Sequence, residues 1–287
     1  MYEEFFGLRA RPFLTVPDPD FVFWSEVHTL AFTMLRYGLM TRAPITVVTG
    51  EIGAGKTMLL RALMRELPED VEVGLISNAQ ANRGELLQWI LMSLDQPIGD
   101  SSYVELFRRL QDHVIEVYAS GRRVVLIFDE AQNLSIDALE ELRMLSNINA
   151  DKDELLQIVL VGQPQLRDLL ARPELVQFAQ RISSDFHLEP LEAEEVERYI
   201  QHRLEVAGAQ WRIFPPRTCE LVRQASRGVP RLVNILCDLC LVYGLAAGVK
   251  VIDEALLREF LTGARRRGIY TQFSPLDDAP KLVRRAR

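Results

Sequence analysis

The sequence predicts a three-layer α/β domain built on a parallel sheet, followed by a helical lid domain. Up to residue 190, strand-like apolar runs alternate with helical stretches, the order typical of a parallel sheet covered on both faces. A glycine-rich loop that matches a phosphate-binding motif follows the first strand. After Pro190 the pattern is helical throughout. We expect an N-terminal segment leading into the core at 1–44, a nucleotide-binding core at 45–190, a lid at 191–264 and a basic tail at 265–287.

Short runs rich in β-branched and aliphatic residues predict the strands. Helices are predicted where apolar residues recur at helical spacing, with Ser25 as the N-cap of the first long helix and Gly121 closing a later one. The predicted strands are 45–49, 71–77, 124–128, 155–161 and 186–188, and the predicted helices are 25–40, 58–64, 83–94, 103–119, 135–147, 166–170, 192–207, 216–226, 230–247 and 253–264.

Residues 50–57 match the complete phosphate-binding pattern G-x-x-x-x-G-K-[ST], known as Walker A. Small residues let the backbone N–H groups of such a loop converge on an anion at the start of the following helix. Lys56 is expected to reach the β- and γ-phosphates, and the Thr57 hydroxyl is expected to hold Mg²⁺. The expected contacts of the bound ATP are Gly50, Glu51, Ile52, Gly53, Ala54, Gly55, Lys56, Thr57 and Met58.

Two acidic residues, Asp129 and Glu130, follow the apolar run 124–128, which we interpret as a central strand. Ligands of open α/β sheets bind at the carboxyl ends of the strands, so this pair fits a Walker B position. Asp129 is expected to hold the Mg²⁺ shell, and Glu130 to orient and deprotonate the attacking water. A glutamate after the Walker B aspartate favours water as the nucleophile, which indicates an ATPase.

The composition is that of an ordinary globular protein, with 287 residues, 48% hydrophobic content and a net charge of −7. The negative charge disfavours a nucleic-acid binder that depends on a basic surface. The exception is 264–287, where seven basic residues face two acidic ones and suggest an anionic partner, lipid or nucleic acid, if the tail is not simply solvated.

The most membrane-like stretch is 232–249, but Asn234 and Asp238 interrupt it, which favours a buried lid helix over a membrane span. Cys237 and Cys240 match C-x-x-C within a helical pattern and have no second cysteine pair, so we interpret both as small core residues. No signal peptide is visible at the acidic N-terminus, which suits a cytoplasmic protein.

Several phrases together resemble a known family. They are the Phe- and Pro-rich start of the chain, "DEAQNL" at 129–134, "VGQPQL" at 161–166, "QRI" at 180–182 and "GVPRLVN" at 228–234. The sequence over about 1–264 resembles AAA+ ATPases of the ExeA, or general secretion pathway protein A, type. Longer members continue into a transmembrane segment and a peptidoglycan-binding domain, so the resemblance implies a short form without that domain.

The resemblance implies roles for residues that the motifs alone do not assign. Gln163 is similar to the sensor 1 residue that contacts the γ-phosphate or the attacking water. Arg231, in Gly-x-Pro-Arg, is similar to the sensor 2 arginine that reaches from the lid to the nucleotide. Asn78 ends the second strand, where some AAA+ proteins restrain the catalytic glutamate, although a turn-forming Asn explains it equally well.

An arginine finger that enters a neighbouring subunit's site is also implied, and Arg181 fits it by position. Members of the family often carry a second arginine four residues later, where this sequence has Asp185. Arg172 is a further candidate. If the second arginine is the true finger, hydrolysis by this protein would be slow or would need a partner.

The resemblance implies a cytoplasmic, oligomeric AAA+ ATPase that supports an envelope secretion or polysaccharide-export system. Its basic tail adds the expectation of a location peripheral to the inner membrane. An envelope-system protein is the expected partner. The alternative is a nucleic-acid-linked switch of the replication-initiator or transposition-helper kind. A third hypothesis, kept open by Asp185, is a scaffold that binds ATP and barely turns it over.

Overall fold

The computed structural model describes residues 1–16, 18–77, 85–150, 153–267 and 272–276, and the chain forms two compact units. The α/β unit is 26–189, and the helical unit combines 1–25 with 190–287. The polypeptide therefore passes between the units twice, after Ser25 and after Glu189. This division differs from the expected one, because the first 25 residues group with the helical unit, and only the rest of 1–44 groups with the α/β core.

The α/β unit is built on a five-stranded parallel sheet with the order β2-β3-β6-β1-β7, which confirms the predicted fold class. In this order β6 separates β1 from β3, so the carboxyl ends of these three strands are adjacent. The strands are β1 (Ile45–Gly50), β2 (Val71–Ser77), β3 (Arg123–Asp129), β6 (Leu156–Gly162) and β7 (Ile182–Leu188), and a separate antiparallel pair is formed by β4 (Asn149–Ala150) and β5 (Asp153–Glu154).

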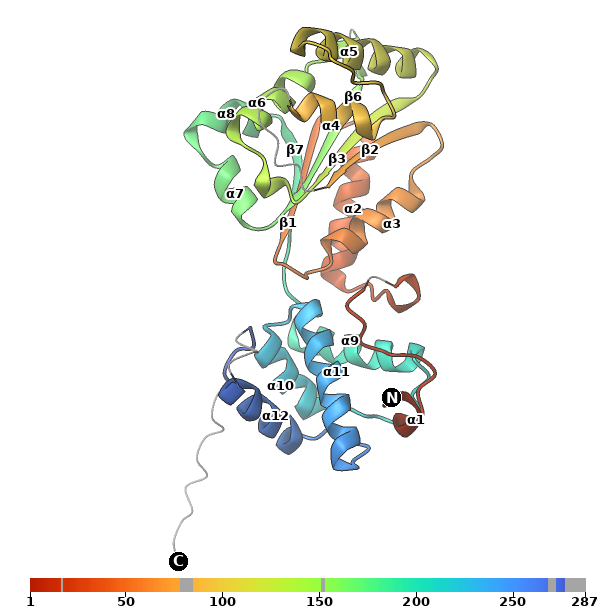
Figure 1. Ribbon diagram of the computed structural model, residues 1–287, viewed down its shortest axis with the longest axis vertical. Helices are drawn as coiled ribbons and strands as arrows, with labels where there is room; N and C mark the ends of the chain where they lie inside the picture. Colours follow the sequence, from red (N-terminus) through yellow and green to blue (C-terminus); the bar gives the residue numbers. More distant parts are fainter. Residues whose placement is uncertain (17, 78–84, 151–152, 268–271, 277–287) are drawn as a thin grey trace, which may run out of the picture. The chain divides into compact units, whose positions relative to one another are not determined.

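Helices cover both faces of the sheet (Figure 1). Alternate residues of β3 serve the two faces: Leu126 and Phe128 lie in one apolar core and Ile127 in the other. Burial on both faces explains why β3 is a continuous apolar run. The first core is closed by α4 (Glu85–Ser93), α5 (Tyr103–Ala119), α6 (Ile136–Leu145), α7 (Gln165–Leu170) and α8 (Val176–Ala179), and the second by α2 (Glu26–Met40) and α3 (Lys56–Glu66).

Several boundaries differ from those predicted. Strand β7 begins at Ile182 rather than at residue 186, and the β4–β5 pair was not predicted at all. The helix predicted at 83–94 corresponds to α4, whose described part begins at Glu85. The last helix, α12 (Glu254–Arg267), continues past residue 264, so the first three residues of the expected basic tail are helical.

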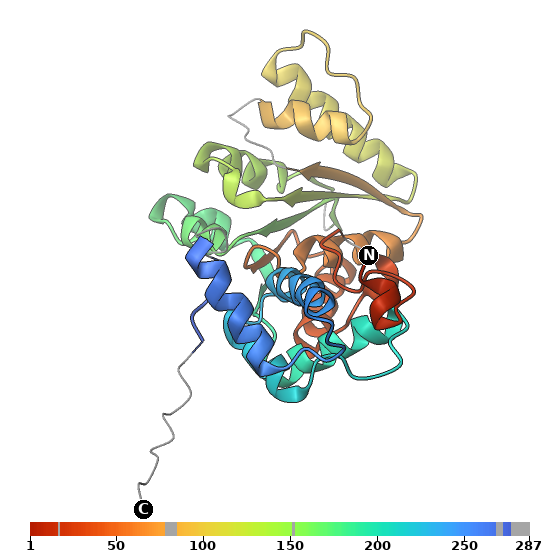
Figure 2. The ribbon, with the colours of Figure 1, turned by 60° about the horizontal axis from the view of Figure 1, so that its bottom comes forward.

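The helical unit consists of the short helix α1 (Glu3–Phe6) and the helices α9 (Ala193–Val206), α10 (Pro216–Ser226), α11 (Pro230–Ala247) and α12. Its core combines both stretches of the chain: Phe6 and Phe13 are buried among residues of α9–α12. Phe13 meets Phe214 edge to face, with ring centroids 6.0 Å apart. Figure 2 shows α1, in dark red, lying next to α11, in blue.

A buried polar network fixes the N-terminal segment in this core. The Arg203 guanidinium donates to the carbonyl of Pro12, to the carbonyl of Leu14 at 3.4 Å and to the Tyr199 hydroxyl at 3.0 Å. The Tyr199 hydroxyl donates to Asn234 Oδ1 at 2.8 Å, and Asn234 Nδ2 donates to the Leu14 carbonyl at 3.2 Å. Residues 12–14 are thus tied to both α9 and α11, which explains why the segment belongs to the helical unit.

Helix α11 is long and apolar enough to cross a membrane by length and composition, and it is the one such helix in the described part of the chain. Val233, Leu236 and Leu241 of this helix are fully buried in the helical core. Cys237 and Cys240 are also fully buried, in keeping with their interpretation as core residues. Among the described residues no cluster of three or more His, Cys, Asp or Glu is placed to hold a metal ion.

Candidate functional site

The phosphate-binding loop joins the buried strand β1 to the start of α3. Gly55 immediately precedes the helix with a φ of +105°, a conformation that strains L-residues. A Cβ built on Gly55 would also lie 2.7 Å from Nε2 of His28. Because the first N–H groups of a helix have no partner within the helix, the start of α3 offers hydrogen-bond donors that suit an anion. The sequence motif therefore adopts the predicted strand–loop–helix context.

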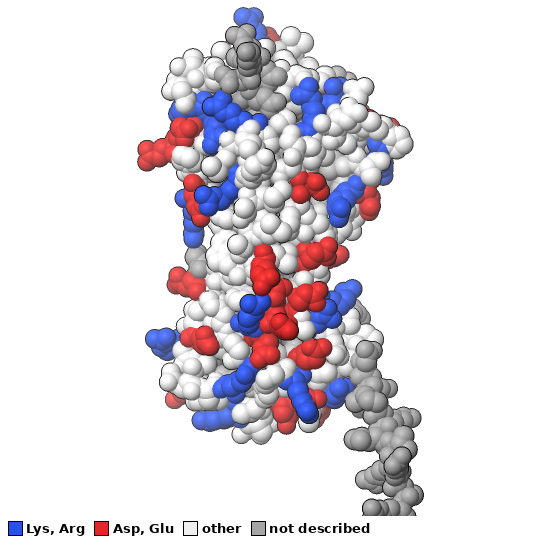
Figure 3. Space-filling model, turned by 180° about the vertical axis from the view of Figure 1, so that it is seen from behind, with Lys and Arg blue, Asp and Glu red and all other residues white. Residues whose placement is uncertain are grey.

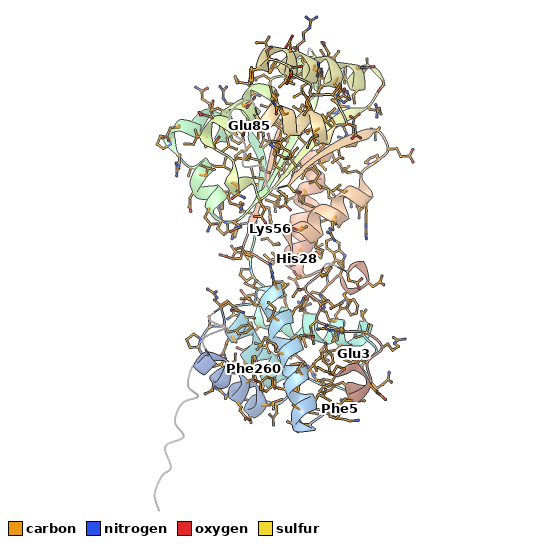
Figure 4. The ribbon with its side chains drawn as sticks, in the orientation of Figure 1. Glu3, Phe5, His28, Lys56, Glu85 and Phe260 are labelled. Atoms are coloured by element: carbon orange, nitrogen blue, oxygen red, sulfur yellow. The ribbon has the colours of Figure 1, made fainter. Side chains whose placement is uncertain are left out.

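Lys56 is held against the loop. Its side chain is buried, and Nζ donates to the carbonyls of Gly50 at 2.7 Å and Glu51 at 2.9 Å. Burial lowers the pKa of Lys56, and the carboxylates of Glu130, Asp129 and Glu51 oppose that shift. These hydrogen bonds hold the ammonium group at the loop, where it can neutralise the charge of a polyphosphate. Figure 4 labels Lys56 and His28, which lie at the end of the sheet where β1 ends.

Thr57 and Asp129 provide the oxygen atoms that Mg²⁺ requires. Thr57 Oγ1 donates to Asp129 Oδ2 at 3.5 Å, so the two side chains meet across the gap between α3 and the end of β3. Burial raises the pKa of Asp129, and the charge of Glu130 adds to that shift, against the opposing effects of the Glu130 backbone N–H, Lys56 and Thr57. A hydroxyl and a carboxylate at this spacing fit Mg²⁺, which when bound would neutralise phosphate charge and favour the ionised carboxylate.

Glu130 follows β3 in the left-handed region, with a φ of +56°. For a residue other than glycine this costs about 1–2 kcal/mol, and such strain clusters at functional sites. The backbone N–H of Glu130 donates to Asp129 Oδ1 at 2.9 Å, which supports the turn. The conformation turns the Glu130 side chain towards β6, where Gln163 Nε2 donates to Glu130 Oε2 at 3.0 Å. The predicted base and the predicted sensor residue are therefore in contact.

The pKa of Glu130 is lowered. Burial of its side chain raises the pKa, but hydrogen bonds from Gln132 and Gln163 and the charge of Lys56 outweigh that effect. The carboxylate is therefore ionised at neutral pH, the state in which it can accept a proton from water.

Three residues that contact these groups were not assigned from the sequence. Gln132 Nε2 donates to Glu130 Oε2 at 2.6 Å. His28 is buried, with Nε2 2.9 Å from the Ala54 carbonyl of the loop. His187 Nδ1 lies 2.8 Å from Thr49 Oγ1, at the end of β1. The segment "DEAQNL" drew attention to Gln132 as part of a family phrase, whereas His28 and His187 are distant in sequence and carry no motif.

Both arginine-finger candidates belong to the α/β unit and lie between α7 and β7 in the sequence. Arg181 follows α8, and its guanidinium donates to Ser146 Oγ at 3.1 Å and to the Asn147 side chain. These contacts tie Arg181 to the end of α6, so its use in a neighbouring subunit would require breaking them. Arg172 is exposed just before the turn 173–175, and Asp185 is exposed on the edge strand β7.

The remaining predicted residues divide between the units. Ile52 and Glu51 are exposed at the loop, and Met58 is half-buried in the first turn of α3. Arg231 is exposed in the first turn of α11, in the helical unit, whereas the phosphate-binding loop belongs to the α/β unit. Asn78 lies outside the described residues, so its expected restraint on Glu130 stays a prediction.

The geometry and the comparisons define the same class. An AAA domain model matches residues 39–170, which include the loop, both acidic residues and Gln163. Over residues 39–170 the chain therefore matches the AAA family, and its parallel sheet and phosphate-binding loop are those of a P-loop fold.

Within that class the chain is similar to General secretion pathway protein A of Aeromonas hydrophila, with 38% identity over 274 residues. That match covers 94% of this chain and 50% of the relative, so the chain spans half the length of the protein it resembles.

Solved structures give the same fold at lower identity. The Cdc6p structure from Pyrobaculum aerophilum matches with a TM-score of 0.63 and 18% identity, covering 83% of this chain and 68% of that one. A chain of the Drosophila ORC bound to DNA matches with a TM-score of 0.65 and 17% identity, covering 88% and 64%. The RuvB branch migration motor of Thermotoga maritima matches with a TM-score of 0.54 and 16% identity, covering 85% and 70%. At these identities the matches support the fold alone.

Proposed function

We propose that this protein binds ATP with Mg²⁺ and hydrolyses it. The observation that carries the proposal is the contact between Glu130 and Gln163 at the carboxyl ends of β3 and β6, in the same unit as Lys56, Thr57 and Asp129. A phosphate-binding loop alone serves many reactions. A carboxylate base that is paired with an amide and follows the Mg²⁺-binding aspartate favours attack by water.

Each residue has a chemical role in this proposal. Lys56 and the loop N–H groups neutralise the phosphate oxygens, and Thr57 and Asp129 would hold Mg²⁺. Glu130 accepts a proton from the attacking water. Gln163 keeps the Glu130 carboxylate oriented and donates to the γ-phosphate or the water as the reaction proceeds. Arg231 would report the nucleotide state to the helical unit, whose movement is the usual output of such a device.

The test is steady-state ATPase activity with a separate binding measurement. We expect Glu130→Gln to retain affinity for a fluorescent ATP analogue while turnover falls by at least about 100-fold, since a general base contributes about 10²–10⁴. Glu116→Gln, in the same unit, is the control because Glu116 is exposed on α5. Turnover that survives in Glu130→Gln would refute the assignment of the base.

We further propose that the active form is an oligomer, with Arg181 or Arg172 completing the site of a neighbouring subunit. The expected signature is a specific ATPase activity that climbs with protein concentration. Wild-type protein that binds ATP and stays at background at every concentration would instead indicate a required partner or a nucleotide-dependent scaffold.

The proposed biological role is support of an envelope secretion or polysaccharide-export system from the cytoplasmic side of the inner membrane. Its support is the similarity to General secretion pathway protein A. The nucleic-acid alternative rests on the basic residues between 265 and 287. On the face of the helical unit shown in Figure 3, acidic side chains gather with basic ones among them, so the described residues seen there form no continuous basic surface. Flotation with anionic liposomes and a DNA shift assay, each with and without 265–287, separate the two.

A further inference from the structure

Gln132 forms a closed hydrogen-bonded ring with the two polar side chains of the site. Its Nε2 donates to Glu130 Oε2 at 2.6 Å, and its Oε1 accepts from the backbone N–H of Gln163 at 2.9 Å. Gln163 Nε2 then returns to the same Glu130 oxygen at 3.0 Å. One side chain from the turn after β3 therefore bridges the ends of β3 and β6.

The orientation of the Gln132 amide follows from chemistry. A backbone N–H can only donate, so the oxygen end of Gln132 must face Gln163. That leaves the NH₂ end facing Glu130, whose ionised carboxylate can only accept. Rotating the carboxamide by 180° would therefore break both hydrogen bonds. An acid or an apolar side chain of the same length cannot make both bonds.

The backbone around Gln132 is shaped to admit it. A Cβ built on Gly162 would lie 2.8 Å from Gln132 Oε1, so any larger residue at the end of β6 would displace the carboxamide. Gln132 itself lies in the short turn 131–133, which begins at the left-handed Glu130. The left-handed backbone of Glu130 and the absence of a side chain at Gly162 are two further features that allow the ring to form, in addition to its hydrogen bonds.

We propose that Gln132 is a positioning residue that locks the base Glu130 and the sensor Gln163 into a single unit. This inference rests on the proposed ATPase function. A shift of Gln163 towards the γ-phosphate or the attacking water would therefore carry the Glu130 carboxylate with it. Charged groups that also face Glu130 are Lys56 from α3 and the neighbouring Asp129. None of the described contacts of Gln132 is with the phosphate-binding loop, so its effect is on turnover rather than on nucleotide affinity.

The kinetic test compares Gln132→Met, Gln132→Glu and Gln111→Met. Met keeps the length of Gln132 without its hydrogen bonds, Glu keeps the acceptor but turns a like charge towards Glu130, and Gln111 is exposed on α5. We expect Gln132→Met to lower kcat by roughly 10- to 100-fold, the range for one hydrogen bond to a charged group, with KM within about twofold. Gln132→Glu should be at least as slow, and Gln111→Met unchanged. An unchanged kcat in Gln132→Met, a loss confined to KM, or a fully active Gln132→Glu would overturn the proposal.

A second measurement does not depend on turnover. In protein labelled with ¹⁵N-glutamine, the side-chain NH₂ signals of Gln132 and Gln163 are assigned by their loss in Gln132→Met and Gln163→Met. Glu130→Gln should shift both signals, Gln132→Met should shift the backbone N–H signal of Gln163, and Gln111→Met should shift none of them. If Glu130→Gln leaves the side-chain NH₂ signals of Gln132 and Gln163 unchanged, the proposed ring is refuted. If wild type fails to hydrolyse ATP while these shifts appear, the proposed function fails and the positioning by Gln132 stands.

Discussion

Replacing Arg203 with Met should release the N-terminal segment from the helical unit. The buried guanidinium donates to the Pro12 carbonyl, the Leu14 carbonyl and the Tyr199 hydroxyl, and it lies over the rings of Phe21 and Tyr199 at 5.1 and 5.6 Å. Leu14 keeps a second donor in Asn234, so the main loss is at Pro12. A buried carbonyl that loses its donor costs about 1–3 kcal/mol, and the other contacts add about 0.5–1 kcal/mol each.

Relief of the buried charge offsets part of this cost, because a desolvated guanidinium is itself unfavourable. The net effect should be about 2–3 kcal/mol on the opening of residues 2–16, or roughly a 30- to 150-fold loss of protection against hydrogen exchange. Exchange measured by mass spectrometry resolves this by region. Arg217→Met, at an exposed position on α10, is the matched control. Protection of residues 2–16 that does not change, or a loss spread evenly over the α/β unit, would refute the reasoning.

Three further predictions concern the phosphate-binding loop and the Cys219 thiol. Gly55→Ala should weaken binding of a fluorescent ATP analogue by at least about tenfold, because it combines a strained φ of +105° with a Cβ 2.7 Å from His28; Gly248→Ala, also at positive φ but with open space around it, should bind normally. Burial raises the pKa of Cys219 to about 12, so this thiol should resist a thiol reagent at pH 8.5 in the native protein and react after denaturation. Since the unfolded thiol ionises near pH 9 and the folded one does not, its contribution to stability is complete below pH 9 and should be lost as the pH rises towards 12. Urea unfolding of wild type beside Cys219→Ala across that range separates this contribution from those of Cys237, Cys240, Tyr2 and Tyr199, whose pKa is also raised.

The features predicted well are those that a short stretch of sequence determines alone. The loop at 50–57 carries its own backbone requirements, and the apolar run of β3 is explained by burial on both faces of the sheet. Glu130 and Gln163 were each expected at the end of a strand, Gln163 on the family resemblance, but their contact was not predicted and is a finding of the structure. The predictions for the loop and for β3 needed only local pattern and the general geometry of parallel sheets.

The features that were missed depend on partners far away in sequence. Strand β7 is an edge strand beside β1 and contains Ser183, Ser184 and Asp185. Because these residues are polar, the sequence pattern indicated a strand only from residue 186. Phe6 and Phe13 gave no sign of which unit they would join, because the polar groups that anchor their segment are on α9 and α11. Gln132 acquires its role only when β6 brings Gln163 and Gly162 beside it.

The split composition of the helical unit has a consequence for synthesis of the protein on the ribosome. Residues 1–25 emerge first, yet the helices that bury Phe6 and Phe13 begin only after Pro190. The intervening α/β unit is continuous in sequence and can complete its fold while the aromatic residues ahead of it still lack a core. The apolar residues of 1–25 therefore stay without their core until α9–α12 are made.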